Sequence, residues 1–379
     1  MKKPDIRNIL VPVDFSKMSG PAIETAQRLA KRFGAAVHLV HVHEYYYPVG
    51  FMAPGAPVPM SMVTFREDTA ERIADQFRTL AKKHGIPTTN CYVRNDTPVF
   101  NGVCKVARQI NADLIVTSTH GNTGVTHFFA GSHAERIVQH SPCPVLVARK
   151  REKRPSRVAS NGKASGSIDT ILVPVDFSQS SFQALEYAIE FAKRVAAKLI
   201  IFHAVHFGYA FTADGYGMYD LSILMEAARK DAEHQMQKFV RRAKFRAVKF
   251  ETVVKVGSPV SEICAFTEQQ NVDLIITATH GRTGFKHLLM GSVAEQVVRH
   301  ARRPVLVLPS HPEVRAARLT RGTRRDQQST DQRAKSQALR ISTERLTKRN
   351  RKLVAHPVPE RRRTNKFRES HAQTTTALR

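Results

Sequence analysis

The stretch THGNTGVTHFFAGS, residues 119–132, recurs in related form as THGRTGFKHLLMGS, residues 279–292. Each copy follows a short, mostly apolar run, 112–116 or 272–276, and precedes an amphipathic one. This order predicts a strand, a glycine-rich loop and the start of a helix. Glycine lets the main chain approach a ligand with no Cβ in the way, and a helix N-terminus offers unpaired N–H donors to an anion. We therefore expect a phosphate ligand, carried by a nucleotide.

A second repeated stretch sets the number of domains. IRNILVPVDFS, residues 6–16, returns almost letter for letter as SIDTILVPVDFS, residues 167–178. Both repeats share an offset of about 160 residues, so the chain contains one unit twice. The expected organisation is a first domain at 1–150, a basic and then Gly/Ser-rich linker at 151–167, a second domain at 168–310 and a tail at 311–379.

Apolar runs alternate with helical patterns within each half. In the first half we expect strands at 6–13, 36–43, 88–94, 113–118 and 144–148, and helices at 20–33, 62–84, 99–110 and 132–140. The alternation is typical of an α/β fold with a parallel sheet covered on both faces. Ligands of such sheets bind beyond the carboxyl ends of the strands, where the strand order reverses. We therefore expect Asp14 and the 119–131 loop at one edge of the sheet, and likewise Asp176 and the 279–291 loop.

Charge and cysteine content limit the class of protein. The net charge is +27, and residues 311–379 hold 19 Lys and Arg against 6 Asp and Glu, a net +13. Because this tail lacks apolar periodicity, we expect it to be disordered. Its positive charge suggests, as a hypothesis, weak and salt-sensitive binding of nucleic acid. The four cysteines have no CxxC spacing, which fits a reducing compartment. No apolar run reaches membrane-spanning length, so we expect a soluble, cytoplasmic protein without a membrane partner.

Several of these motifs together resemble the universal stress protein family. They are the opening ILVPVDFS, a His-Val or His-Ala pair ending the second strand (His41 and His203), the two glycine loops, and the closing segments SPCPVLV (141–147) and RRPVLVL (302–308). The resemblance covers about 5–149 and 168–309. It implies an open five-stranded parallel sheet in each half, flanked by helices on both sides. Dimers of this family pair through the last strand of each subunit. In this chain the resemblance therefore implies an internal pseudo-dimer, in which the strand at 144–148 pairs with the strand at 304–308. Two such chains could also associate with each other.

Nucleotide-binding members of the family hold ATP phosphates with a G-x2-G-x9-G-[ST] motif. The first glycine of this motif falls on Ser118 and Ala278, so both halves depart from it at that position. The aspartate that lies near the adenosine in the family corresponds to Asp14 and Asp176. The positions that line the family's adenine pocket correspond to Val42 and Ala204. Carried over by position, the sites comprise Pro12, Asp14, Val42, Ser118, Gly121, Gly131 and Ser132 in the first half, and Pro174, Asp176, Ala204, Ala278, Gly281, Arg282, Gly291, Ser292 and Val293 in the second.

Other roles for these residues remain open. The glycines also fit simple turns, and the Gly-Ser serines and the two aspartates also fit helix N-caps. The loops at 45–60 and 207–219 either cover a ligand or pack on the partner domain. Arg282 and Val293, against Asn122 and His133 in the first copy, favour the second half as the better nucleotide site. Neither a catalytic triad nor a metal cluster accompanies the loops, so we expect binding rather than chemistry.

The sequence thus predicts an adenine-nucleotide-binding regulator of the stress response, with ATP, with or without Mg²⁺, as its ligand. One alternative is an enzyme, because the fold resembles that of adenylate-forming nucleotidyl-transfer enzymes. The other is a nucleotide-free structural or adaptor protein whose glycine loops have lost their ligand.

Overall fold

The structure is a computed structural model that describes residues 5–44, 60–118, 132–149, 167–206, 221–279 and 290–309. All of them belong to one compact unit, Met1–Ala316. The expected loops at 45–60 and 207–219, the linker at 151–167 and the basic tail at 311–379 lie wholly or almost wholly outside the described residues. Their predicted roles therefore stay predictions.

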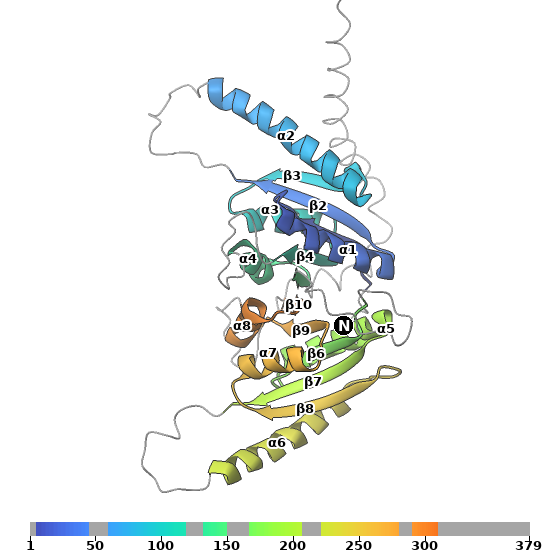
Figure 1. Cartoon of the computed structure of the whole chain (residues 1–379), viewed down its shortest axis with the longest axis vertical. Coiled ribbons are helices and arrows are strands. Elements are labelled where there is room, and N and C mark those ends of the chain that lie inside the picture. Colours follow the sequence, from blue (N-terminus) through green and yellow to red (C-terminus); the bar gives the residue numbers. More distant parts are fainter. Residues whose placement is uncertain are drawn as a thin grey trace, which may run out of the picture. The chain divides into compact units, whose positions relative to one another are not determined.

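The first half alternates strands and helices in the predicted order (Figure 1). Its strands are β1 (Asn8–Pro12), β2 (Ala36–His43), β3 (Cys91–Asn95), β4 (Leu114–Ser118) and β5 (Val145–Ala148). Its helices are α1 (Gly20–Phe33), α2 (Met60–His84), α3 (Val99–Gln109) and α4 (Ser132–His140), with short 3-10 turns at Lys17–Ser19 and Thr88–Asn90.

The second half repeats this order. Its strands are β6 (Thr170–Pro174), β7 (Lys198–Val205), β8 (Phe250–Val256), β9 (Leu274–Ala278) and β10 (Val305–Leu308). Its helices are α5 (Gln179–Val195), α6 (Leu221–Arg241), α7 (Pro259–Gln269) and α8 (Ser292–His300).

The end of α1 illustrates how the sequence sets these bounds. Gly34 has a φ of 70°, a left-handed conformation that costs glycine little. Its N–H bonds to the carbonyl of Ala30, and the N–H of Ala35 bonds to the same oxygen at 2.9 Å. These bonds close the helix and turn the chain into β2, as the sequence predicts.

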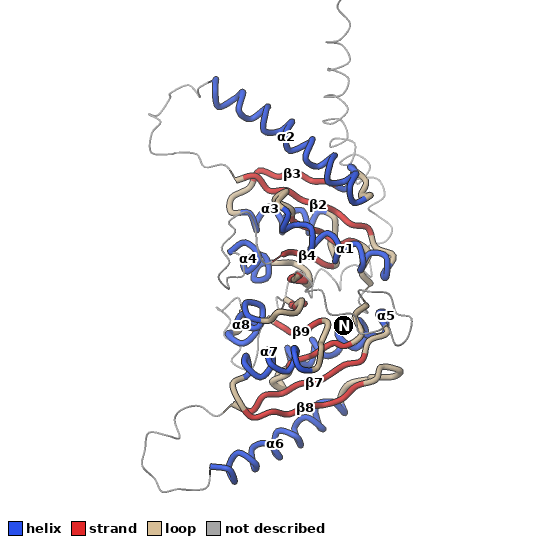
Figure 2. The backbone as a smooth tube through the Cα atoms, viewed as in Figure 1, coloured by secondary structure: helices blue, strands red, loops and turns tan. Residues whose placement is uncertain are grey.

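The ten strands form one sheet in the order β3-β2-β1-β4-β5-β10-β9-β6-β7-β8. All neighbours within a half are parallel, and the sole antiparallel pair among the described strands joins β5 to β10. Figure 2 shows the strands of the two halves following one another from β3 to β8. The two predicted five-stranded parallel sheets are therefore present and are continuous with each other.

Helices cover both faces of this sheet. Buried side chains of α1, α2, α5 and α6 form one core with one face of the strands, and those of α3, α4, α7 and α8 form a second core with the other face. Neighbouring residues of β5 and β10 alternate between the cores, as the pleat of a strand requires. Each core contains residues of both halves, so the halves share their hydrophobic interior.

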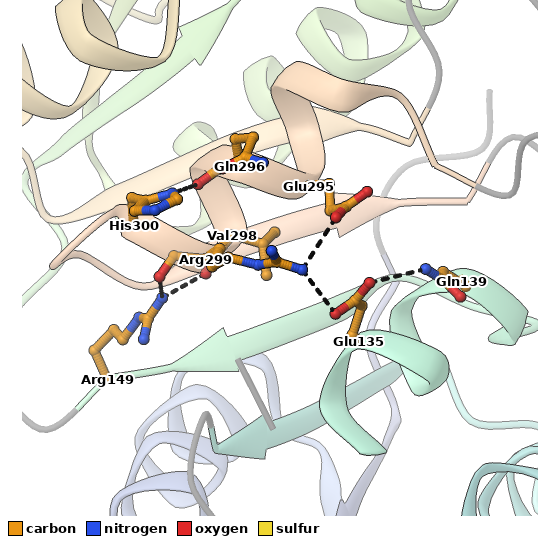
Figure 3. A network of polar contacts seen from close by, with 8 residues as sticks. All are labelled: Glu135, Gln139, Arg149, Glu295, Gln296, Val298, Arg299 and His300. Atoms are coloured by element: carbon orange, nitrogen blue, oxygen red, sulfur yellow. Dashed lines mark hydrogen bonds and ion pairs between the residues drawn. The ribbon is translucent and has the colours of Figure 1, made fainter. Parts of the chain in front are cut away.

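Arginines add polar contacts between the halves. Arg32 of α1 donates from Nε to the carbonyl of Arg194, at the end of α5, at 2.9 Å. Arg149 follows β5 and donates to the carbonyls of Val298 and Arg299, near the end of α8 (Figure 3). A guanidinium at a helix C-terminus balances the negative end of the helix dipole. These contacts hold α5 and α8 of the second half against the first.

Candidate functional site

The strand order reverses between β1 and β4 in the first half and between β6 and β9 in the second. β1 and β4 are paired only at Ile9–Leu114 and Leu10–Ile115, although β1 continues beside β2 to Pro12 and β4 continues beside β5 to Ser118. The last residues of β1 thus pair with β2 and those of β4 pair with β5, so the two strands do not pair with each other at their carboxyl ends. β6 and β9 repeat this arrangement. Such reversal points are where open parallel sheets bind ligands.

The expected site residues of the described strands flank these two points. In the first half, Asp14 comes two residues after β1, and Ser118 ends β4. In the second, Asp176 comes two residues after β6, and Ala278 ends β9. The structure therefore brings each aspartate to the same edge of the sheet as the strand that leads into its glycine loop.

Hydroxyl groups hold the Asp14 carboxylate in a tight turn. Its Oδ1 accepts hydrogen bonds from the Oγ of Ser16 and of Ser19, both at 2.7 Å, and from the N–H of Ser16 at 3.0 Å. Burial alone would raise the pKa of Asp14, but these hydrogen bonds outweigh it and lower the pKa below its ordinary value. Asp14 is therefore a carboxylate at neutral pH.

The other oxygen of Asp14, Oδ2, is buried and has no hydrogen-bond partner among the described residues. A buried carboxylate oxygen usually accepts at least one hydrogen bond. Since Asp14 lies at the strand-order reversal, this oxygen is suited to accept a hydrogen bond from a ligand.

The second aspartate sits in a different turn. Asp176 Oδ1 accepts the N–H of Ser178 at 3.0 Å, as Asp14 does from Ser16. The Oγ of Ser178, however, accepts the N–H of Ser181 and thereby caps α5. The Ser181 hydroxyl donates to the carbonyl of Ser178. In the first half, the hydroxyl of Ser19, the residue equivalent to Ser181, donates to the carboxylate of Asp14 instead.

A histidine and a phenylalanine contact each other at both aspartate turns. These contacts were not predicted from the sequence. His41 Nδ1 lies 2.9 Å from the carbonyl of Val13, and His203 Nδ1 lies 2.7 Å from that of Val175. The rings contact Phe15 and Phe177, which both have left-handed backbones, with φ of 60° and 62°. This conformation is uncommon outside glycine and marks a constrained turn. The repeated PVDFS motif together with the histidine of each second strand was the available signal.

The residues expected at the adenine pocket, Val42 and Ala204, are next to last in the second strand of each half. Val42 is buried, and it packs so closely on Gly102 of α3 that a Cβ there would lie 2.8 Å from its Cγ1. Ala204 is half-buried and packs on the core that contains α7 and α8. Pro12 and Pro174 are the last residues of β1 and β6, and a proline has no N–H to donate to a neighbouring strand.

The end of the second glycine loop is described and reaches the same edge. The N–H of Gly291 bonds to the carbonyl of Thr279 at 2.6 Å, and the N–H of Thr279 bonds to that of Leu308. These bonds fix the start of α8 beside the ends of β9 and β10. Gly291 is the N-cap of α8, and no side chain in the described part of the chain caps this helix. Ser292 and Val293 are exposed in its first turn, where the N–H groups of a helix have no intrahelical partner.

The remaining site residues are not described or only in part. Gly121, Gly131, Gly281 and Arg282 lie outside the described residues, and of Ser132 only the backbone, at the start of α4, is described. Within the described ranges there is no group of three His, Cys, Asp or Glu that could hold a metal ion. Among the described helices, none is long and apolar enough to cross a membrane.

Comparison with known proteins gives the family. The model of the universal stress protein family matches twice, at residues 5–149 and 167–309. A universal stress protein of Methanocaldococcus jannaschii is 33% identical over 138 residues, which are 36% of this chain and 80% of that protein. A putative universal stress protein of Staphylococcus aureus is 32% identical over 146 residues, 38% of this chain and 86% of its own length.

A solved structure matches both halves together. The crystal structure of a putative universal stress protein from Pseudomonas aeruginosa covers 84% of this chain and 98% of its own, with a TM-score of 0.52 and 18% identity. At that identity the likeness concerns the fold alone. The mostly parallel sheet flanked by helices is thus shared with solved members of the family that matches each half.

Proposed function

The chain belongs to the universal stress protein family, and from this we propose that it binds adenine nucleotide, ATP in the first instance, and acts as a stress-response regulator. The observation that supports this most is the start of α8, which main-chain bonds fix beside the carboxyl end of β9 with its first N–H groups uncapped in the described chain. An uncapped helix N-terminus at a strand-order reversal is suited to phosphate.

The adenosine would lie beside the aspartate of the same half. Asp176 follows β6, the neighbour of β9, and Asp14 occupies the equivalent position with a buried carboxylate oxygen that has no partner among the described residues. A carboxylate there can accept hydrogen bonds from ribose hydroxyls or an adenine amino group. Val42 and Ala204 would offer apolar contact to the base, since both pack on the core next to these turns.

We expect the second half to bind more tightly. Arg282 in its loop would supply a cation for the phosphates, and the equivalent residue of the first half is the neutral Asn122. Binding, with at most slow hydrolysis, is the proposed activity, and the occupied loops would change the surface that other proteins meet. Mg²⁺ would accompany the triphosphate as a ligand of its oxygens.

The first experiment measures nucleotide directly on the full-length chain. Protein purified without added nucleotide is denatured, and the released adenine nucleotide is quantified by chromatography. ATP is then titrated by calorimetry into wild type, Ser292→Glu and Ser261→Glu. A glutamate in the first turn of α8 favours the helix but repels a phosphate at the same end. Ser261 is exposed in the first turn of α7, so the same exchange there is the matched control.

We expect weaker ATP binding in Ser292→Glu and wild-type binding in Ser261→Glu. Wild-type protein that neither releases nucleotide nor binds ATP would favour the nucleotide-free adaptor. Pyrophosphate release when metabolites are supplied with ATP would favour the nucleotidyl-transfer enzyme.

A further inference from the structure

One arginine of the second half binds a glutamate from each half. Arg299 Nη2 lies 3.1 Å from Glu295 Oε1, one turn earlier in α8, and 3.3 Å from Glu135 Oε2 in α4 of the first half. Figure 3 shows the guanidinium pointing between the two carboxylates, with Gln139 donating to the other oxygen of Glu135. The contact to Glu135 joins residues 164 positions apart in the chain.

Both glutamates lie in the first turn of helices that begin at the two Gly-Ser pairs. Glu135 is the fourth residue of α4, which starts at Ser132, and Glu295 is the fourth of α8, which starts at Ser292. A carboxylate in a first helical turn favours the helix, but it opposes an anion that binds at the same end. Each proposed phosphate site therefore has an unfavourable charge one turn away unless a cation balances it.

Among the described residues, the single guanidinium of Arg299 pairs with both carboxylates. By the offset of the repeat, the counterpart of Arg299 is Gln139, which is neutral, whereas the glutamates correspond to each other. The side chains of Arg299 and Glu135 are 25% exposed and that of Glu295 is 29% exposed. Salt and water screen partly buried charges less than exposed ones. The charge of Arg299 thus acts on the N-termini of both helices, although it belongs to only one half.

We infer that Arg299 is a positioning residue shared by both nucleotide sites, and that the first-half site depends on this residue of the second half for its affinity towards anions. The inference rests on the proposed nucleotide binding at the two Gly-Ser pairs. The two sites then depend on the same charge, because replacing Arg299 removes the balancing cation from both of them. It also gives the tandem arrangement a functional consequence, since a first half alone would leave Glu135 without the guanidinium.

The test follows each site separately in the full-length chain. Hydrogen exchange of peptides from 119–140 and from 279–300 is measured by mass spectrometry during titration with ATP and, separately, with adenosine. The variants are Arg299→Gln, Arg299→Lys and the control Arg303→Gln. Arg303 is also partly buried and pairs with Glu268 of α7 at 3.0 Å, within the second half, so the control removes the same charge from another ion pair.

We expect Arg299→Gln to weaken ATP protection of the first-half peptide by about two- to fivefold, the size of charge effects at helix ends. Adenosine, which carries no charge, keeps its wild-type affinity, whereas a merely structural disturbance would weaken both ligands. Arg299→Lys retains most of the ATP affinity, and Arg303→Gln retains all of it.

Three results would overturn the inference. They are a first-half ATP affinity in Arg299→Gln equal to wild type, equal losses for ATP and adenosine, and ATP protection confined to the second half of the wild type. The proposed nucleotide binding itself survives each of them. A wild type that shows no ATP protection in either peptide would remove both proposals.

Discussion

Leu146 of β5 lies directly opposite Leu306 of β10, its own counterpart in the repeat. The flanking pairs, Val145 with Val307 and Val147 with Val305, follow the same symmetry around this point. Antiparallel pairing lets one short strand bond to its repeat-related copy and leaves neither as an open sheet edge. Both leucines belong to the core on the α1 and α5 face, so this contact joins the halves through buried apolar surface.

The first prediction concerns that contact. Leu306→Ala should lower the free energy of unfolding by about 2–5 kcal/mol, since truncating a buried leucine leaves a cavity. Leu306 is 1% exposed, whereas Ile223 on α6 is 66% exposed. Ile223→Ala is therefore the control and should cost about 0.5 kcal/mol or less. Urea unfolding measures both, and equal stability of the two variants would contradict the role given to β10.

The second prediction concerns acid stability. His38 of β2 is 9% exposed, with Nε2 3.3 Å from Asn8 Oδ1 and Nδ1 3.4 Å from the Tyr92 hydroxyl. Burial lowers the pKa of His38 below its ordinary 6.5. Between the two values the unfolded chain binds the proton and the folded chain does not. Stability from this residue is therefore present above pH 6.5 and is lost as pH falls towards the folded pKa.

His38→Gln should flatten this dependence. The free energy of unfolding, measured in urea from pH 7.5 to 5, should fall less in the variant than in wild type. His41 and His84 also have a pKa lowered by burial, so part of the slope should remain. A slope identical to that of wild type would show that His38 takes no part.

The third prediction concerns the Asp14 turn. Ser19→Ala removes one of the hydroxyls that hold Oδ1, so the pKa of Asp14 should rise. The carboxylate stabilises the fold above its ordinary pKa of 3.8, and this stability is lost as pH falls through the lowered folded value. The variant should therefore cost about 1.5–3 kcal/mol at pH 7, as for a hydrogen bond to a charged group, and less near pH 2.

Carbon-detected NMR of the Asp14 carboxyl group follows this pKa. Ser181→Ala is the matched control, because Ser181 is the repeat counterpart of Ser19 and donates to the Ser178 carbonyl instead. It should leave the Asp14 titration as in wild type. An unchanged titration in Ser19→Ala would mean that the hydroxyl does not set this pKa.

Sequence and structure agree where local signals are strong. The helix Gly20–Phe33, the strand Ala36–His43 and the helix Ser132–His140 have the bounds that their Gly stops and apolar runs predict. The third strand is less well predicted, because Thr88–Asn90 forms a 3-10 turn and β3 begins only at Cys91. Short strands at a sheet edge carry little periodicity, so their limits depend on pairing.

The candidate site is predictable only in part. Repeated motifs identify Asp14, Asp176 and the Gly-Ser pairs, because those signals lie within short stretches of chain. The bond from Ser19 to Asp14 and the ion pair of Arg299 with Glu135 depend on turn geometry and on how the halves pack. Comparing the two repeats does not predict these contacts, since the equivalent residues, Ser181 and Gln139, make different contacts.

The fourth prediction concerns the close approach of α3 to β2. A Cβ added at Gly102 would lie 2.8 Å from Val42 Cγ1, 2.9 Å from Val42 Cγ2 and 3.1 Å from Asp96 Cβ. Gly102→Ala should therefore cost about 1–3 kcal/mol by overpacking, and it should weaken ATP in the first half by displacing Val42. Gly20→Ala, where the added Cβ meets nothing within 4 Å, is the control. Equal stability and equal ATP affinity of the two variants would contradict this account of Val42.

The most direct test of nucleotide binding is a crystal structure of the full-length chain with ATP. Our account predicts triphosphate density at the start of α8, within hydrogen-bonding distance of the N–H groups of Ser292 and Val293, and adenosine beside Asp176. Crystals grown with ATP whose second half shows no nucleotide there, or nucleotide bound elsewhere on the chain, would contradict it.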